Sequence, residues 1–132
     1  MRRVTGIGGV FFKPNDPQKL YVWYEKHLGI RPDPNGAGAT FHWRGAENPD
    51  GTGMTVWAIF PANTSYFGSN GKQFMVNFRV ADLVALLAAL RAEGVAVDDK
   101  VEEAPYGKFG WITDPEGNRI ELWEPPPESS GQ

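Results

Sequence analysis

Residues 114–125 show the clearest pattern of apolar and polar positions in the chain. The first five, Asp-Pro-Glu-Gly-Asn, favour a tight turn, because proline fixes φ while glycine and asparagine tolerate positive φ. The residues that follow alternate apolar and polar side chains, which is typical of a half-buried strand. Ile120 and Leu122 should therefore point to one face of a sheet, and Glu121 and Trp123 to the other. The pattern predicts a core face and a second face that carries a carboxylate beside a large aromatic ring.

Two helices are indicated by apolar residues that recur every three or four positions. The first begins after Asp16, a residue type that favours helix N-termini, and stops at Gly29. The second begins after Asp82 and stops at Gly94. Each helix is expected to bury one apolar stripe. The stripes consist of Leu20, Trp23, Tyr24, His27 and Leu28 in the first helix, and of Leu83, Leu86, Leu87 and Leu90 in the second.

Strand-like runs surround both helices and reveal an internal repeat. In the first half they span residues 4–12, 41–44 and 54–60, and in the second half residues 73–80, 95–101 and 109–113. The superposition of the halves places Asp16 on Asp82, Gly29 on Gly94, Phe41 and Trp43 on Phe109 and Trp111, and Pro61 on Pro125. The repeat predicts two βαβββ modules, at 1–62 and 72–126, with a connector at 63–71 and a disordered tail at 127–132.

Composition excludes several classes of protein and site. The chain has 132 residues, with 13 Lys and Arg against 16 Asp and Glu, and these charges are dispersed. A basic face that would bind nucleic acid or a membrane surface is therefore not expected. With no long apolar run and no signal-peptide pattern, we expect a soluble cytoplasmic protein. The absence of cysteine and the presence of only His27 and His42 exclude thiolate sites and a three-histidine zinc site within one chain.

The chain resembles the glyoxalase / bleomycin-resistance / dioxygenase group, the vicinal oxygen chelate superfamily, over nearly all of residues 4–125. The resemblance rests on four stretches, which are Gly8–Phe12 leading to Asp16, Trp23-Tyr24 before Leu28-Gly29, Val80–Leu83 before Glu93–Val95, and residues 114–125. It implies an α+β fold in which two tandem βαβββ modules form a curled mixed sheet around a cavity. It also implies a homodimer, and it leaves the activity open because the scaffold hosts lyases, dioxygenases, epimerases and antibiotic-binding proteins.

Metal-dependent members of that family place four ligands at positions that correspond here to Gly9, Trp57, Met75 and Glu121. Only Glu121 offers an oxygen donor, and even a catalytic metal site normally keeps about three protein ligands. We therefore predict no metal cofactor. The alternative, a divalent metal, would need donors from elsewhere, such as His42 or a partner chain.

Two roles remain open for Glu121. Asn77 and Arg79 project onto the same predicted face, so Glu121 could form a structural pair with Arg79 beneath a pocket floor. Alternatively, Glu121 is a catalytic general base or a hydrogen-bond acceptor for a ligand. His42 also has two interpretations, a catalytic acid or base that faces the cavity or a half-exposed surface residue.

The predicted cavity face is apolar and aromatic, as is usual for sites that bind small molecules. Its predicted ligand-binding residues are Phe11, Trp57, Met75, Asn77, Arg79 and Trp123. The preferred hypothesis is a glyoxalase-like or bleomycin-resistance-like protein that binds a small, partly aromatic or hydrophobic molecule without the family's metal. Two alternatives are a lyase or dioxygenase with a metal site rebuilt around Glu121, and a structural module whose cavity is filled.

Overall fold

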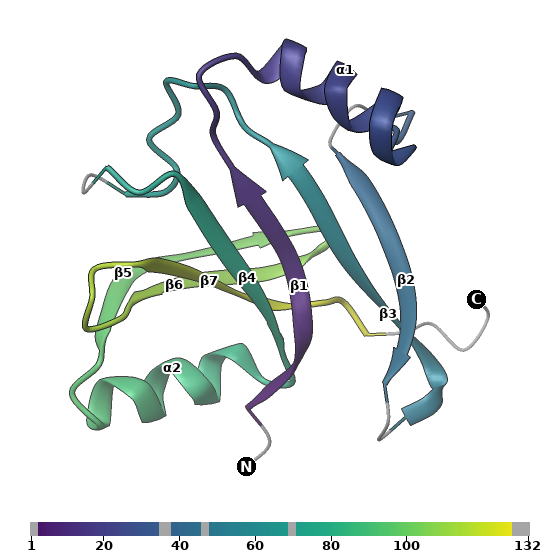
Figure 1. The fold of residues 1–132 in the computed structure, drawn as a ribbon. Helices are drawn as coiled ribbons and strands as arrows, with labels where there is room; N and C mark the ends of the chain where they lie inside the picture. Colours follow the sequence, from purple (N-terminus) through teal and green to yellow (C-terminus); the bar gives the residue numbers. More distant parts are fainter. Residues whose placement is uncertain (1–2, 35–37, 46–47, 69–70, 128–132) are drawn as a thin grey trace.

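The computed structural model describes residues 3–34, 38–45, 48–68 and 71–127, which form one mixed sheet and two helices (Figure 1). The first half of the chain contains β1 (Val4–Phe12), α1 (Pro17–Leu28), β2 (Ala39–Gly45) and β3 (Asn48–Ile59). The second half contains β4 (Phe74–Val80), α2 (Leu83–Ala92), β5 (Ala96–Ala104), β6 (Gly107–Thr113) and β7 (Arg119–Glu124). Apart from Pro127, the tail that was predicted to be disordered lies outside the described residues.

The strands follow the order β2-β3-β1-β4-β7-β6-β5. The two halves meet where β1 pairs antiparallel with β4, and each of these strands pairs in parallel with the last strand of its own half, β3 or β7. The predicted α+β fold with a mixed sheet is confirmed. Within the described residues the first half contributes three strands and the second half four, so the βαβββ pattern is complete only in the second half.

Strand pairing defines two faces of the sheet, because directly paired residues point to the same side. Gly9 pairs with Asn77, and Asn77 pairs with Glu121, so these three share what we call the inner face. Val10, Val76 and Ile120 are paired in the same way on the opposite, outer face. The predicted alternation along β7 is therefore confirmed.

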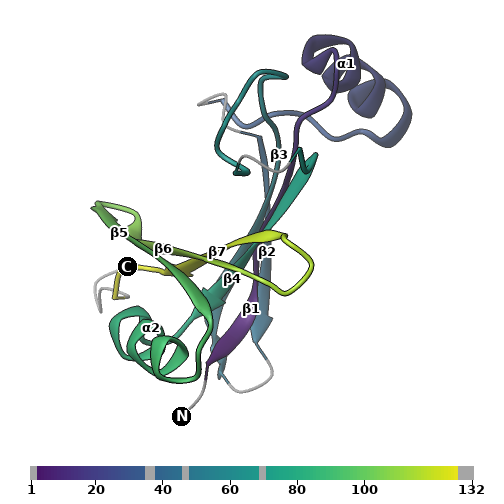
Figure 2. The ribbon, with the colours of Figure 1, turned by 90° about the vertical axis from the view of Figure 1, so that its left-hand side faces the viewer.

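Helix α2 covers the outer face of the second half, as Figures 1 and 2 show. The Asp82 side chain caps the helix by accepting a hydrogen bond from the Ala85 backbone N–H at 3.1 Å. Leu83, Leu86 and Leu87 are buried against Val80 and Leu122, with further apolar residues of β4–β7 around them. The predicted stripe of α2 thus forms one hydrophobic core of the protein.

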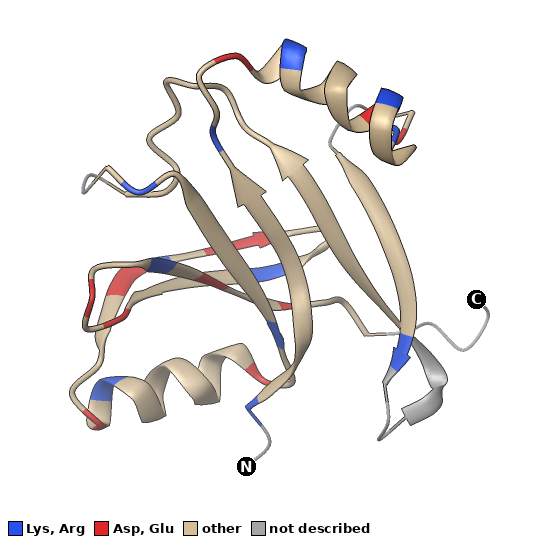
Figure 3. Cartoon of the chain, in the orientation of Figure 1, with Lys and Arg blue, Asp and Glu red and all other residues tan. Residues whose placement is uncertain are grey.

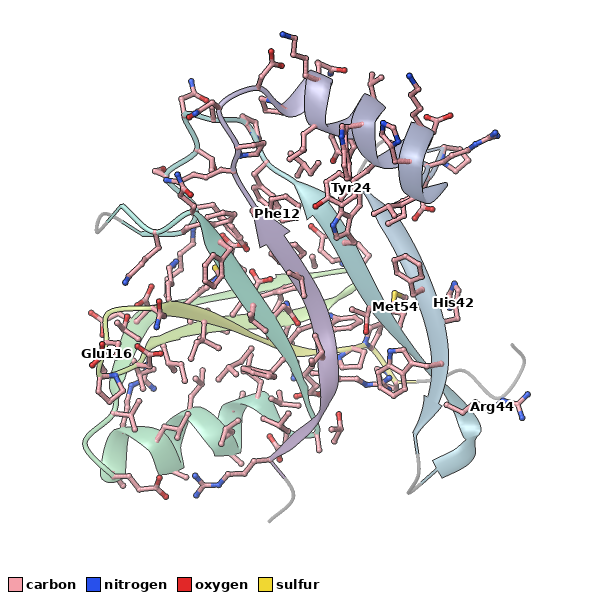
Figure 4. The ribbon with its side chains drawn as sticks, viewed as in Figure 1. Phe12, Tyr24, His42, Arg44, Met54 and Glu116 are labelled. Carbon is pink, nitrogen blue, oxygen red and sulfur yellow. The ribbon has the colours of Figure 1, made fainter. Side chains whose placement is uncertain are left out.

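Helix α1 is attached differently, and the prediction that it buries a continuous stripe is wrong. None of its residues is buried, and Trp23 and Leu28 are 50% and 59% exposed. Figure 2 shows the helix beyond the end of β1. Its contacts with the sheet come from Tyr21, whose hydroxyl donates to the Ile59 carbonyl at 3.1 Å, and from Tyr24, which points toward Phe12 (Figure 4).

The segment between β3 and β4, residues 61–68, packs against the inner face. The ring of Phe67 is completely buried in a cluster with Phe11, Ala58, Met75 and Trp111. This cluster occupies the middle of the inner face, where the sequence predicted an apolar ligand cavity. A side chain from the linking segment therefore packs against Phe11 and Met75, and the apolar ligand cavity stays a prediction.

No helix within the described residues is both long and apolar enough to cross a membrane.

We predict that Phe67→Ala lowers the free energy of unfolding by about 3–5 kcal/mol, because it empties a fully enclosed site. The matched control is Phe74→Ala, since Phe74 is 58% exposed on β4, and its cost should be about 1 kcal/mol or less. Urea unfolding of both variants measures the difference. Equal costs for the two substitutions would show that segment 61–68 is not part of the core.

Candidate functional site

The turn before β7 fixes the position of Glu121. The Asp114 carboxylate accepts hydrogen bonds from the backbone N–H groups of Glu116 and Asn118, both at 2.9 Å, and Gly117 adopts a φ of +85°. These bonds to the charged form, above all those from Asn118, hold the pKa of Asp114 below its ordinary value. The turn predicted from the sequence is confirmed, and it delivers Glu121 to the inner face of the sheet.

Three donors from different parts of the chain surround the Glu121 carboxylate, which is 3% exposed. Asn77 on β4 donates its side-chain N–H to Oε1 at 2.6 Å, and Trp111 on β6 donates its indole N–H to Oε2 at 3.1 Å. The hydroxyl of Tyr66, from segment 61–68, also donates to Oε2. Both carboxylate oxygens are therefore engaged, as a buried charged group requires.

Burial is the largest influence on the pKa values of Glu121 and Tyr66. It raises the pKa of Glu121 above its ordinary value, although the hydrogen bonds from Tyr66, Asn77 and Trp111 oppose the rise. The pKa of Tyr66 is raised strongly by burial and by the neighbouring Glu121 charge. Tyr66 therefore keeps its proton at physiological pH and acts as a hydrogen-bond donor to Glu121.

The Asn77 side chain lies between Glu121 and Gly8. Its N–H group meets the Glu121 carboxylate, while its buried carbonyl oxygen has no hydrogen-bond partner among the described residues. That oxygen lies against β1 at Gly8, where an added Cβ would collide with it. Gly8 thus leaves the room that Asn77 needs to face Glu121, which explains a glycine in the middle of a strand.

An open cleft of about 650 Å³ lies beside the filled centre of the inner face. Its walls come from segment 61–68 on one side and from β5, β6 and β7 on the other. The side chains that carry its chemistry are those of Tyr66, Asp98, Lys100, Glu102, Trp111 and Arg119. Glu121 lies behind Tyr66 and Trp111 and is not one of the lining residues, so the cleft presents aromatic rings and ion pairs.

The Tyr66 ring and the Arg119 guanidinium form the floor of this cleft, and the Trp111 ring, which is only 2% exposed, packs against both. The Tyr66 and Trp111 rings meet edge to face, with centroids 6.1 Å apart and an interplanar angle of 86°. The Arg119 guanidinium lies 5.1 Å from the Trp111 ring centroid and 6.0 Å from that of Tyr66. Its N–H groups also donate to the Tyr66 carbonyl and the Asp98 carboxylate, at 3.3 and 2.9 Å.

Trp57 does not lie where the sequence predicted it. It pairs with Val10 and therefore lies on the outer face. There its ring packs against that of Tyr24 on α1, with the ring centroids 4.8 Å apart. Counted back five residues from the helix caps, Phe11 corresponds to Asn77 of the second half, and Phe11 pairs with Ala58 as Asn77 pairs with Glu121. The position that the family resemblance assigned to Trp57 therefore corresponds to Ala58, one residue further on.

The family's divalent metal does not fit these positions. Gly9, Ala58 and Met75 provide no nitrogen or oxygen side-chain donor, and the oxygens of Glu121 accept three hydrogen bonds. Nor do the described residues contain any group of three or more His, Cys, Asp or Glu side chains that could hold an ion. Glu121 therefore serves as an acceptor for protein donors at the position where relatives place a metal ligand.

The remaining predicted residues are dispersed. Phe11 and Met75 lie on the inner face but inside the packed cluster, and Trp123 donates its indole N–H to the Tyr106 carbonyl at 2.8 Å. The guanidinium of Arg79 lies 5.9 Å from the ring centroid of Trp43, near β2, rather than among the donors to Glu121.

His42 is exposed on β2, at the edge of the sheet, and Figure 4 shows it far from β7. Its pairing with Met54 places it on the inner-face side. Its solvent exposure corresponds to the surface interpretation, and it takes no part in the network around Glu121. Its catalytic role stays a prediction without support from a neighbouring acidic or basic partner in the described residues.

The sequence reasoning missed most of the cleft. It named Trp111 only as the counterpart of Trp43 in the internal repeat, and it did not single out Tyr66, Arg119 or the charged residues of β5. One signal was available for Trp111, because it lies two strand positions from Phe109 and so shares a face with it. Nothing local to segment 61–68 indicates that Tyr66 reaches a carboxylate 55 positions later in the chain.

A model of the Glyoxalase/Bleomycin resistance protein/Dioxygenase superfamily matches residues 7–122, so the chain belongs to this superfamily. The resemblance seen in the sequence is confirmed. None of the curated protein sequences is significantly similar to the chain.

Solved structures support the same fold. A Streptomyces coelicolor methylmalonyl-CoA epimerase in complex with 2-nitronate-propionyl-CoA superimposes with a TM-score of 0.66 and 17% identity, over 94% of this chain and 99% of that one. Methylmalonyl-CoA epimerase from Mycobacterium tuberculosis superimposes with a TM-score of 0.59 and 24% identity, over 94% of this chain and 90% of that one. The Mn(II)-bound glyoxalase from Novosphingobium aromaticivorans superimposes with a TM-score of 0.62 and 19% identity, over 94% of this chain and 40% of that one. At these identities the likeness shows the fold alone.

The raised pKa of Glu121 predicts a specific dependence of stability on pH. The folded protein holds the Glu121 proton more tightly than the unfolded chain, whose carboxyl titrates near 4.5. The associated stability is complete below that pH and is lost as the pH rises through the folded pKa. Relative to Glu121→Gln, which does not titrate, the wild-type protein should therefore become less stable over this interval. Urea unfolding at a series of pH values measures the difference.

Glu93→Gln is the matched control for this prediction. Glu93 is exposed and its pKa is lowered by Arg3, which donates to it at 2.7 Å, so its removal should produce the opposite trend with pH. A constant difference between the wild-type protein and Glu121→Gln across the whole series would contradict the raised pKa.

Proposed function

We propose that this protein binds a small, partly aromatic molecule in the cleft between segment 61–68 and strands β5–β7, without a metal ion at the family's four positions. The observation that supports the proposal most directly is the half-buried Tyr66 ring, which lines the cleft and packs edge to face against the buried Trp111 ring. The two rings stand at nearly a right angle and donate to the same oxygen of Glu121. The buried carboxylate thereby fixes the Tyr66 ring at the wall of the cleft and the buried Trp111 ring that packs against it.

The size and the rigidity of the cleft suit a ligand of this kind. Its volume of about 650 Å³ lies in the range of small-molecule sites, roughly 300–1,000 Å³. Aromatic surfaces that are held in place before binding favour planar ligands, since little side-chain freedom is lost when the ligand arrives. The Arg119 guanidinium adds a polar, planar neighbour to these rings.

The same geometry favours binding over acid–base catalysis. A molecule in the cleft meets the Tyr66 and Trp111 side chains before it reaches the Glu121 carboxylate. A proton passing between ligand and Glu121 would have to cross Tyr66, whose raised pKa makes its hydroxyl a poor proton donor in acid–base chemistry. For the lyase or dioxygenase alternative, the part of the chain that the structure describes offers no group of donors for a rebuilt metal site.

Mapping of ligand-induced chemical shifts tests the location of the site. Small aromatic fragments, each paired with its saturated-ring counterpart, are titrated into isotope-labelled protein, and backbone amide shifts are recorded. We expect the aromatic member of each pair to bind more tightly and to shift residues 65–68, 98–102 and 111–113. A response confined to residues 14–24, where a second hollow lies against α1, would contradict the proposal.

Chelation tests the metal-free part. Dialysis against a chelator is expected to leave both fragment affinity and melting temperature unchanged, because no group of donors in the described residues fits an ion. Calorimetric titration with Mn²⁺ and Zn²⁺ provides the complementary measurement. A stoichiometric ion whose removal abolishes binding would overturn the assignment.

A further inference from the structure

Charged side chains are concentrated in the half of the protein that contains the cleft. Figure 3 shows acidic and basic residues interspersed over β5–β7, whereas β1, β2 and β3 carry few charges. Three charged residues of β5 line the cleft with alternating sign, namely Asp98, Lys100 and Glu102. With Arg119 they make two acidic and two basic groups, so the formal charges of the lining cancel.

These four groups form two ion pairs. Arg119 and Asp98 lie 2.9 Å apart at the aromatic end, and Lys100 and Glu102 lie 2.7 Å apart further along β5. The first pair is the more fixed, because the Arg119 side chain is only 20% exposed and is stacked on Trp111. The Lys100 side chain is 69% exposed, so its ammonium is free to leave Glu102 for another anion.

From this arrangement we propose that the ligand is zwitterionic, with the chemistry of an aromatic α-amino acid. The inference rests on the proposed function, since it uses the same cleft. Arg119 engages Oδ2 of Asp98, which leaves Oδ1 to accept an ammonium group from the ligand. Lys100, two residues along β5, receives the ligand carboxylate, and the aromatic side chain packs against the half-buried Tyr66 ring.

Electrostatics explains why one charge alone is not favoured. An anion attracted to Lys100 or Arg119 also meets Asp98 and Glu102, each within 3 Å of its basic partner, and a cation meets the reverse arrangement. The attraction and repulsion nearly cancel for a single charge in a lining of zero net charge. A ligand that carries both a positive and a negative charge places each one beside the oppositely charged side chain of β5, and so makes two favourable contacts.

Four ligands that share a phenyl ring and a short carbon chain separate these possibilities. Phenylalanine is zwitterionic at neutral pH, phenethylamine is cationic, 3-phenylpropionate is anionic and 3-phenylpropionamide is neutral. In calorimetric titrations of the wild-type protein we expect phenylalanine to bind about threefold to fivefold more tightly than either singly charged ligand.

Two substitutions assign the charges. Lys100→Gln should remove the advantage of phenylalanine over phenethylamine, and Asp98→Asn should remove its advantage over 3-phenylpropionate. Lys26→Gln on α1 is the control for Lys100→Gln, because it also removes one positive charge, at an exposed position away from the cleft. It should leave all four affinities unchanged.

The outcomes distinguish the inference from the proposed function. If all four ligands bind equally and shift the amides of the cleft, the cleft binds aromatic molecules and the charge inference is wrong. The same conclusion follows if 3-phenylpropionate matches phenylalanine, or if Lys100→Gln weakens every ligand to the same extent. If none of the four binds at millimolar concentration, both the inference and the proposed function are rejected.

Discussion

Burial of the Glu121 carboxylate is the constraint on which the inner face depends. A charged group with so little access to water is tolerated only while its oxygens keep their hydrogen bonds, and loss of one donor leaves an uncompensated charge. The three donors, Tyr66, Asn77 and Trp111, belong to segment 61–68, β4 and β6. One carboxylate on β7 therefore couples two strands and an irregular segment, and it fixes the rings that bound the cleft. The demands of folding and of the proposed ligand binding coincide at this residue.

The features that the sequence predicted well are those determined by neighbouring residues. The Asp16 and Asp82 caps, the turn at Asp114 and the alternation along β7 each depend on short-range geometry. The error at Trp57 came from aligning Pro61 with Pro125, which shifted the last strand of the first half by one residue. Because side chains alternate along a strand, a shift of one residue moves every side chain to the opposite face. Ala58 therefore occupies the position assigned to Trp57.

The cleft escaped prediction because it is assembled from distant parts of the chain. Segment 61–68 has no periodic pattern, so its composition indicates a connector and does not show that Phe67 enters the core. The charges of β5 read as an ordinary solvated edge until the topology brings Arg119 beside Asp98, 21 positions earlier in the sequence. Three of the four metal positions that the family resemblance implies lack donors in this chain. The charged and aromatic side chains of the cleft lie beside these positions, and most of them belong to parts of the sequence that contain no recognised motif.

The loose attachment of α1 divides the molecule into parts of unequal local stability. A helix of 12 residues is marginal by itself in water, and this one is held mainly by contacts of Tyr21 and Tyr24 with the end of the sheet. Its amide hydrogens should exchange with solvent through a local opening that leaves β4–β7 intact. On heating, part of the helical signal would then disappear before the cleft proposed to bind ligand is lost. Thermal melting followed by circular dichroism would report an earlier event than melting followed through the bound ligand.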